Sequence, residues 1–289
     1  MELRTLQYFL AVAREQSINK AAESLHMTQP PLSRQMMDLE QELGCTLFIR
    51  GNRKITLTEE GMLLRRRAEE MLELAEKTKS EVTAMDEQIH GEVYIGGGET
   101  RGFSLVAKAC HLLQEQHPDV RFHLYSGNAE DVTDRLERGL LDMALVIGGF
   151  DASLYHSLPL PVRDTWGLLL RKDHPLASHT AITASDLTGE PLLISRQALE
   201  RGELKQWLGN SHSTIAATYN LIYNASLMVE EGLGCAFTLE GLSQNTDSLC
   251  FRPLSPPITA GLSMIWKKGQ ILGKAARNLL DVLQEEYTI

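Results

Sequence analysis

The stretch TQPPLSRQMMDLE, residues 28–40, decides the fold of the N-terminal part of the chain. Thr28 is a suitable N-cap, and prolines cost little in the first helical turn because their missing N–H groups would have no intrahelical partner there. Leu32, Met36 and Leu39 then follow at helical spacing and form one apolar stripe. These residues therefore predict a helix with a stiff start and with polar and basic side chains on its outward face.

Two amphipathic helices are predicted before this stretch and a basic turn after it. Apolar residues at helical spacing predict one helix near residues 3–13 and a second one after Ser17, a good N-cap. Gly44 ends the third helix, and two short strands are predicted on either side of RGNRK, residues 50–54. Three helices followed by this β-wing predict a winged helix-turn-helix domain over residues 1–58.

The charge of the chain is unevenly distributed. The 289 residues carry a formal net charge of −10, but residues 1–58 have a net charge of +1, against −4 for residues 59–90 and −7 for residues 91–289. An acidic protein can still bind nucleic acid if its cations are concentrated on one face. The N-terminal segment is therefore the candidate for contact with DNA.

A long helix is predicted over residues 59–90. Its apolar positions repeat every 3.5 residues, a spacing that a coiled-coil seam keeps and a lone helix loses. The seam consists of Leu64, Ala68, Met71, Ala75, Thr78, Val82, Met85 and Ile89. We expect this linker helix to form a dimer contact. The alternative is a single helix that lies on its own domain.

After His90-Gly91 the pattern changes to strands alternating with helices, which predicts an α/β domain with a parallel sheet over residues 91–289. No stretch reaches the roughly 20 apolar residues of a membrane span. The four cysteines are scattered without a CxxC pair, as in a reducing cytosol, although a redox pair of Cys235 and Cys250 is an alternative. We therefore expect a cytoplasmic protein.

Enzyme and cofactor motifs are missing from the sequence. The nine histidines form no HxH or HExxH pattern, and no GxSxG elbow is present, so neither a metal site nor catalysis is expected. The glycines of YIGGGETRGF, residues 94–103, lack both the dinucleotide spacing and the P-loop Lys-Ser/Thr, so no nucleotide cofactor is expected.

An ordered set of residues nearly along the whole chain resembles the LysR-type transcriptional regulators. The match is strongest over residues 3–65 and weaker but continuous beyond them. It includes Leu3, Leu6, Phe9, Ser17, Ala21-Ala22, Leu25, Thr28-Gln29-Pro30, Leu32-Ser33-Arg34-Gln35, Leu39-Glu40, Leu43-Gly44, Leu47-Phe48, Arg50, Thr56-Leu57-Thr58, Gly61, His117-Pro118, Gly139, Leu141-Asp142-Met143-Ala144, His174-Pro175-Leu176-Ala177, Val229 and Gly232-Leu233-Gly234.

The resemblance implies a winged helix-turn-helix, a dimerising linker helix and an effector-binding domain similar to periplasmic binding proteins. That domain has two α/β lobes joined by two crossing strands. We expect lobe I at residues 91–161 and 266–289 and lobe II at residues 162–265.

In this fold, residues 28–40 are the recognition helix, whose first turn enters the major groove. Gln29, Ser33 and Arg34 are expected to contact base edges or the groove, because Arg pairs with guanine and Gln with adenine. The expected DNA contacts also include Thr28 and Pro31 at the same helix end, and Arg50, Arg53 and Lys54 in the wing. The alternative is a solvated helix face. Residues 65–67, three arginines, are either another phosphate patch or a solvated flank of the linker helix.

The effector site is expected between the lobes. Thr100 and Asn128 precede helices that face the cleft, at places where an anion is favoured. The alternative is that both are plain N-caps. From the second lobe we expect Ser195, Arg196, Tyr219 or Asn224, and Thr238. Glu99 and Arg101 beside Thr100, and the apolar Ile147, leave the charge of the effector open.

The sequence thus predicts a DNA-binding transcription regulator controlled by a small-molecule effector, with no cofactor. Its expected partners are double-stranded operator DNA, the effector, further copies of the chain in a homodimer or homotetramer, and RNA polymerase. Two alternatives remain open at this point. One is a small-molecule-binding protein or enzyme in which the α/β domain is the functional part, and the other is a repressor that responds to no effector.

Overall fold

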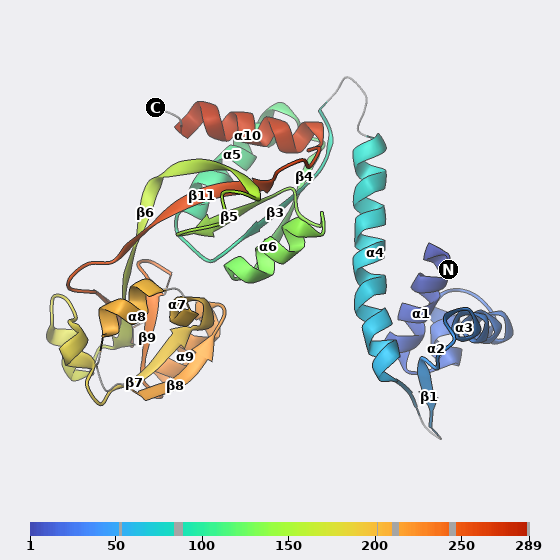
Figure 1. Ribbon diagram of the computed structural model, residues 1–289, viewed down its shortest axis with the longest axis horizontal. Helices are drawn as coiled ribbons and strands as arrows, with labels where there is room; N and C mark the ends of the chain where they lie inside the picture. The colour runs from blue at the N-terminus through green and yellow to red at the C-terminus, as the bar shows by residue number, and fades with distance from the viewer. Residues whose placement is uncertain (52–53, 84–88, 201, 210–213, 243–246, 288–289) are drawn as a thin grey trace. The chain divides into compact units, whose positions relative to one another are not determined.

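The computed structural model describes residues 1–289 except 52–53, 84–88, 201, 210–213, 243–246 and 288–289 (Figure 1). The chain divides into two compact units, Met1–Thr83 and Ala84–Ile289. Each unit has a hydrophobic core of its own, as expected of a structural domain. None of the described helices is long and apolar enough to cross a membrane.

The first unit confirms the predicted winged helix-turn-helix. Its elements are α1 (Leu3–Glu15), α2 (Ile18–Ser24), α3 (Gln29–Leu43), β1 (Phe48–Arg50), β2 (Ile55–Leu57) and α4 (Glu59–Thr83). Strands β1 and β2 pair antiparallel and form the wing. Ser17 caps α2 by accepting a hydrogen bond from the N–H of Lys20 at 3.4 Å. Thr28 occupies the N-cap position of α3, but its side chain makes no capping hydrogen bond.

The apolar stripe of α3 lies in the core of this unit. Leu32, Met36 and Leu39 are each at most 1% exposed. They pack with α1, whose Phe9 ring lies 5.3 Å, centroid to centroid, from the ring of Phe48 in the wing. Each side chain of this size contributes about 1.5–3 kcal/mol when it is fully buried. This burial fixes the rotation of α3 and leaves its opposite face to solvent.

The predicted apolar seam of helix α4 is buried near the helix start and exposed further along. Near the helix start, Ala68 is buried and Leu64 is half-buried, and both pack against the core of the first unit. Further along, Met71 and Val82 are 40% and 60% exposed. The first part of the seam therefore agrees with the alternative of a helix lying on its own domain, and only the later seam residues are exposed.

The seam is also shorter than predicted. The described part of helix α4 extends to Thr83, and residues 89 and 90, which were expected to belong to it, are not helical. Met85 lies outside the described residues, and Ile89 packs against a core of the second unit.

The second unit contains a nine-stranded sheet and six α-helices among its described residues. The strands are β3 (Gly91–Gly97), β4 (Val120–Ser126), β5 (Met143–Ile147), β6 (Tyr155–Arg171), β7 (Pro191–Ser195), β8 (Thr214–Tyr219), β9 (Cys235–Leu239), β10 (Leu249–Pro253) and β11 (Thr259–Lys267). The helices are α5 (Phe103–Gln116), α6 (Ala129–Glu137), α7 (Arg196–Glu200), α8 (Gly202–Leu208), α9 (Ile222–Glu230) and α10 (Lys274–Tyr287), with short 3-10 helices η1 (Pro175–Ser178) and η2 (Ala184–Leu187).

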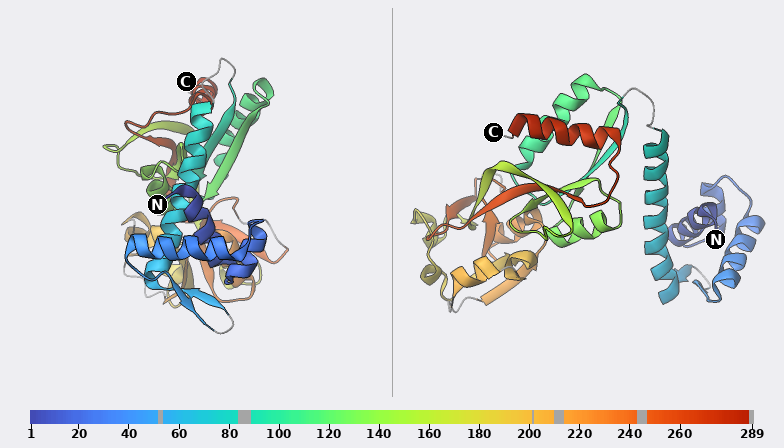
Figure 2. Two further views of the ribbon diagram at one scale, coloured as in Figure 1. Left: turned by 90° about the vertical axis from the view of Figure 1, so that its right-hand side faces the viewer. Right: turned by 45° about the horizontal axis from the view of Figure 1, so that its top comes forward.

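Two long antiparallel strands, β6 and β11, connect two lobes (Figures 1 and 2). In lobe I, β3 pairs parallel with β4 and β5. In lobe II, β7 pairs parallel with β8 and β9. The sheet order is β4-β3-β5-β11-β6-β9-β7-β8, with β10 on β6. The parallel sheet expected from the sequence is therefore interrupted by the two crossing strands, as the resemblance implied.

Helices cover both faces of each lobe, because the buried residues of the inner strands alternate between two cores. In lobe I, α5 and α10 pack on one face and α6 on the other. In lobe II, α7 and α8 pack on one face and α9 on the other. The crossing strand β11 enters the lobe I core at Leu262, next to a register shift after Gly261. This lies before the boundary at residue 265 that we drew from the sequence.

Candidate functional site

The start of helix α3 carries the expected DNA-contacting side chains. Thr28, Gln29, Pro31 and Arg34 are exposed, and Ser33 is half-buried. Gln29 and the proline after it occupy the first two helical positions, and the proline ring restricts the backbone there. These side chains therefore lie together at the N-terminal turns of one helix, opposite its buried stripe.

The wing is held on α3 by a contact that sequence patterns did not indicate. The Glu40 carboxylate accepts hydrogen bonds from the N–H groups of Leu47 at 2.7 Å and Phe48 at 3.2 Å. Lys54 is exposed beyond β1. Arg50 belongs to β1, but its side chain and the whole of Arg53 lie outside the described residues.

Two of the three arginines at positions 65–67 agree with the interpretation of a solvated flank of the linker helix. Arg65 forms an ion pair with Glu69 at 3.1 Å, and Arg67 forms one with Glu70 at 2.8 Å. Both pairs lie on α4 at one-turn spacing, and such exposed pairs contribute about 0.3–0.5 kcal/mol each. Two of the three cations are thus engaged within their own helix.

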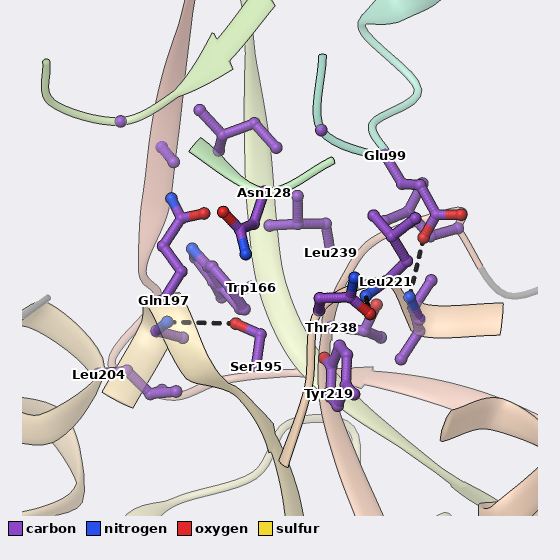
Figure 3. Close-up of a pocket in the computed structure, with 18 of the residues that line it drawn as sticks. Glu99, Asn128, Trp166, Ser195, Gln197, Leu204, Tyr219, Leu221, Thr238 and Leu239 are labelled. Carbon is purple, nitrogen blue, oxygen red and sulfur yellow. Dashed lines mark hydrogen bonds between the residues drawn. The ribbon is translucent and has the colours of Figure 1, made fainter. Parts of the chain in front are cut away.

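A cavity of about 440 Å³ lies between the two lobes of the second unit (Figure 3). This volume is within the range of small-molecule sites. Both lobes and both crossing strands contribute to its walls. The lining residues are Gly98, Glu99, Gly127, Asn128, Ile147, Gly148, Gly149, Trp166, Ser195, Gln197, Ala198, Leu204, Tyr219, Asn220, Leu221, Ile222, Thr238, Leu239, Leu242, Ile258 and Ala260.

Four of the expected effector residues line this cavity: Asn128, Ser195, Tyr219 and Thr238. Asn128 caps α6, since its side-chain oxygen accepts from the N–H of Asp131 at 2.9 Å. The Ser195 hydroxyl accepts from the N–H of Ala198 at 3.2 Å. The Tyr219 hydroxyl donates to the carbonyl of Phe237. Burial, and then the nearby Glu99 carboxylate, raise the pKa of Tyr219, so its hydroxyl stays protonated.

The other three expected residues do not line this cavity. Thr100 is 7% exposed and lies at a neighbouring depression, where its hydroxyl accepts from the N–H of Gly102 at 2.9 Å. Arg196 is exposed and lines a different depression. Asn224 is exposed on α9. We therefore remove Thr100, Arg196 and Asn224 from the effector set. For Thr100 the reason is that its hydroxyl is engaged within the chain, by the N–H of Gly102 and by Asp164.

Among the described residues, two side-chain hydrogen bonds connect the lobes beside the cavity, and sequence reasoning missed both. From lobe I, the Glu99 carboxylate accepts from the N–H of Ile222 at the start of α9, at 2.8 Å. From lobe II, the Gln197 side chain accepts from the N–H of Ala129 at the start of α6, at 3.0 Å. Each acceptor satisfies an N–H group in the first turn of a helix, where no intrahelical partner exists.

The crossing strands place a buried carboxyl group close to the cavity. Asp164 on β6 is 8% exposed and stands opposite Ala260 of β11, which lines the cavity. Burial raises the pKa of Asp164, and a hydrogen bond with Thr100 opposes this rise. One oxygen of Asp164 has no hydrogen-bond partner among the described residues.

One cluster of possible metal ligands was not apparent from spacing. His174, Glu190 and Cys235 offer ligand atoms that all lie within 4.8 Å of one another. However, Nδ1 of His174 accepts a hydrogen bond from the N–H of Leu176, so the neutral ring carries its proton on Nε2, the atom that faces the other two groups. Burial raises the pKa of the Cys235 thiol to about 12. The cluster as it stands therefore suits an ordinary hydrogen-bonded histidine better than a metal ion.

Together, a helix-turn-helix unit and a two-lobed α/β unit with a cavity between its lobes define a ligand-regulated DNA-binding protein. The family description "LysR substrate binding domain" matches residues 86–288, and "Bacterial regulatory helix-turn-helix protein, lysR family" matches residues 3–62. The chain belongs to the LysR family of transcriptional regulators, whose members are regulators rather than enzymes.

Similar proteins cover the full length of the chain. The Hca operon transcriptional activator HcaR of Escherichia coli (strain K12) is 31% identical over 99% of this chain and 98% of its own length. The HTH-type transcriptional regulator YybE of Bacillus subtilis (strain 168) is 30% identical over 100% of both chains. Among solved structures, the LysR family regulator CbnR has a TM-score of 0.76 at 18% identity, covering 100% of both chains, and so supports the fold.

Proposed function

We propose that this regulator reads double-stranded operator DNA with the first turns of α3 and responds to a small molecule held in the interlobe cavity. In this proposal Gln29 and Arg34 contact base edges, and Ser33 contacts the backbone or a base. Thr28 and Pro31 position that end of the helix, while Arg50, Arg53 and Lys54 in the wing contact phosphates. The exposed cluster on α3, opposite its buried stripe, supports this assignment.

The observation that best supports binding of a small-molecule effector is the way in which the cavity is built. Its walls come from two lobes that are connected through the crossing strands β6 and β11 and through the hydrogen bonds of Glu99 and Gln197. A molecule that contacts both walls favours the closed arrangement of the lobes over an open one. Differential affinity for two arrangements is what lets a ligand shift a population. Asn128, Ser195, Tyr219 and Thr238 contribute polar groups to this site, beside Glu99, Gln197 and Asn220.

The exposed apolar residues of α4 support self-association. Met71, Leu74 and Val82 are between 40% and 60% exposed on one helix, and a second copy of the helix would bury them. We propose a homodimer or homotetramer on this basis, with action in the cytoplasm, where the DNA is, and RNA polymerase as a further partner. The cavity lining contains no histidine, cysteine, lysine or arginine among the described residues, which gives no support to a catalytic role.

The experiment has two parts. A mobility shift with DNA from upstream of the protein's own gene, repeated over a range of salt concentrations, tests specific binding against an equal length of random DNA. A thermal-shift screen of small molecules on the full chain then tests for an effector, because a ligand that binds the folded state raises its stability. The proposal expects a specific complex and at least one stabilising ligand. Equal affinity for both DNAs would contradict it.

A further inference from the structure

The cavity is lined mainly by apolar side chains. Trp166 lies on one crossing strand and Ala260 on the other. The remaining apolar walls are Ile147, Ala198, Leu204, Leu221, Ile222, Leu239, Leu242 and Ile258. Surfaces of this kind favour ligands that bury apolar area, with a few polar groups to fix their orientation.

The lining carries one carboxylate and no cation among the described residues. That carboxylate is Glu99, and it already accepts the Ile222 N–H. Two arginines lie near the cavity without lining it. Arg101 is exposed and packs its side chain against Gly241, and Arg196 is exposed at a different depression. An anion in the cavity would therefore meet a fixed negative charge without a cation in the wall to offset it.

At two helix starts beside the cavity, those of α9 and α6, backbone N–H groups already donate to side chains of the protein. At α9, the Glu99 carboxylate stands where the carboxylate of a ligand would bind, with the backbone N–H of Ile222. At α6, Gln197 accepts from the N–H of Ala129, and Asn128 accepts from the N–H of Asp131. The N–H groups of Ile222, Ala129 and Asp131 are thus satisfied from within the chain, and near the start of α7 the N–H of Ala198 donates to the Ser195 hydroxyl.

Among the described residues of the cavity wall, one buried side-chain polar atom lacks a hydrogen-bond partner. The Thr238 hydroxyl is in a side chain only 2% exposed, lines the cavity, and makes no hydrogen bond with the described residues (Figure 3). Buried hydroxyl groups are normally hydrogen-bonded, and each exception needs an explanation. A polar group on a bound ligand would supply the missing partner.

We propose that the effector is a largely apolar molecule without a negative charge and with at least one hydrogen-bonding group, which contacts Thr238, while Glu99 takes the place of the anionic group and excludes anions. This inference rests on the proposed function, because it describes the ligand of the same cavity. It also assigns a role in specificity to Glu99, a residue that otherwise only joins the two lobes.

A matched pair of dyes tests the charge preference. N-phenyl-1-naphthylamine is uncharged and carries one N–H donor, and 1-anilinonaphthalene-8-sulfonate is the same skeleton with one negative charge. Both fluoresce more strongly in apolar surroundings, so titrations of the full chain give both affinities. The proposal expects the uncharged dye to bind at least about tenfold more tightly, because like charges repel in a site of low dielectric.

Substitutions then locate the dye. Ile147→Trp fills part of the cavity and should abolish binding of the uncharged dye, while melting curves monitor its folding. Thr238→Val removes the hydroxyl and keeps the shape, and should weaken that dye about fivefold or more. Glu99→Ala frees the start of α9 and should strengthen the anionic dye about tenfold. Glu115→Ala, which removes an exposed charge on α5, is the matched control and should change neither affinity.

Three results would overturn the inference: equal or tighter binding of the anionic dye by the wild type, failure of the uncharged dye to bind, or uncharged-dye binding that both Ile147→Trp and Thr238→Val leave unchanged. An operator mobility shift on the same samples tests the proposed function independently of the ligand class. Specific DNA binding with a preference for the anionic dye would refute the ligand class alone, whereas loss of specific DNA binding would refute the regulator proposal.

Discussion

Removing the Glu99 carboxylate should release one of the two hydrogen bonds that join the lobes. Glu99→Ala leaves the N–H of Ile222 without its acceptor, which lies 2.8 Å away in the native protein. Ile222 is the first residue of α9, so its N–H has no intrahelical partner. Glu99→Gln is the matched control, because it keeps a side-chain oxygen and removes only the charge.

The size of the effect follows from the kind of bond. A hydrogen bond to a charged acceptor contributes about 1.5–3 kcal/mol. Since about 1.4 kcal/mol corresponds to a factor of ten, the population with this contact open should rise by a factor of about 10–150 in Glu99→Ala. In Glu99→Gln, a neutral hydrogen bond of about 1 kcal/mol remains, so the rise should be several-fold smaller.

Amide hydrogen exchange on the full chain measures this opening. Exchange at the start of α9 is measured in peptides that span residues 218–230. It should be slowest in the wild type, faster in Glu99→Gln and fastest in Glu99→Ala. Peptides from α5, residues 103–116, serve as the internal control and should exchange as in the wild type. Unchanged protection at the start of α9 in Glu99→Ala would refute the role of Glu99 as a connection between the lobes.

Three further predictions concern the DNA helix, the linker helix and the buried carboxyl group. Arg34→Ala should weaken operator binding by about 1–3 kcal/mol and relax the preference at one base pair, whereas an equal loss on operator and random DNA would make Arg34 a phosphate contact. Met71→Asp and Val82→Asp should each weaken self-association, because burying an unpaired carboxylate is costly; light scattering that finds both variants as fully assembled as the wild type would contradict this. Asp164→Asn should raise the melting temperature at neutral pH. The reason is that burial raises the pKa of Asp164 in the folded protein, so its ionisation destabilises the fold as pH rises, and the gain should disappear below the ordinary pKa of 3.8.

Local sequence patterns were sufficient to predict the elements of the first unit. The stripe of Leu32, Met36 and Leu39 has helical spacing, and the structure buries all three. The linker seam was less predictable, because an apolar residue at helical spacing looks the same whichever surface covers it. Ala68 faces its own domain whereas Val82 is exposed, and the spacing does not distinguish them.

The effector cavity was predictable only where a strand end or helix start marks it. Asn128 and Thr238 stand at such positions, and both line the cavity. Trp166 lies inside β6, so its place in the wall depends on how the crossing strands and the two lobes meet. Gln197 is at the start of α7, but its sequence position gave no sign that its side chain reaches the other lobe. Contacts between residues far apart in the chain, such as Gln197 with Ala129, leave no trace in local periodicity.

We infer that the open or closed arrangement of the lobes around the cavity is coupled to the binding of DNA within one chain. The most direct test is a titration of the operator, selected from random DNA by the wild-type protein, with wild type and Glu99→Ala at one fixed salt concentration. Glu99 lies in the second unit and α3 in the first, so a change in operator affinity requires coupling between them. We predict a change of about fivefold or more, within the usual range for linked sites. Superimposable binding curves from samples in which hydrogen exchange shows the α9 contact to be open would contradict the account.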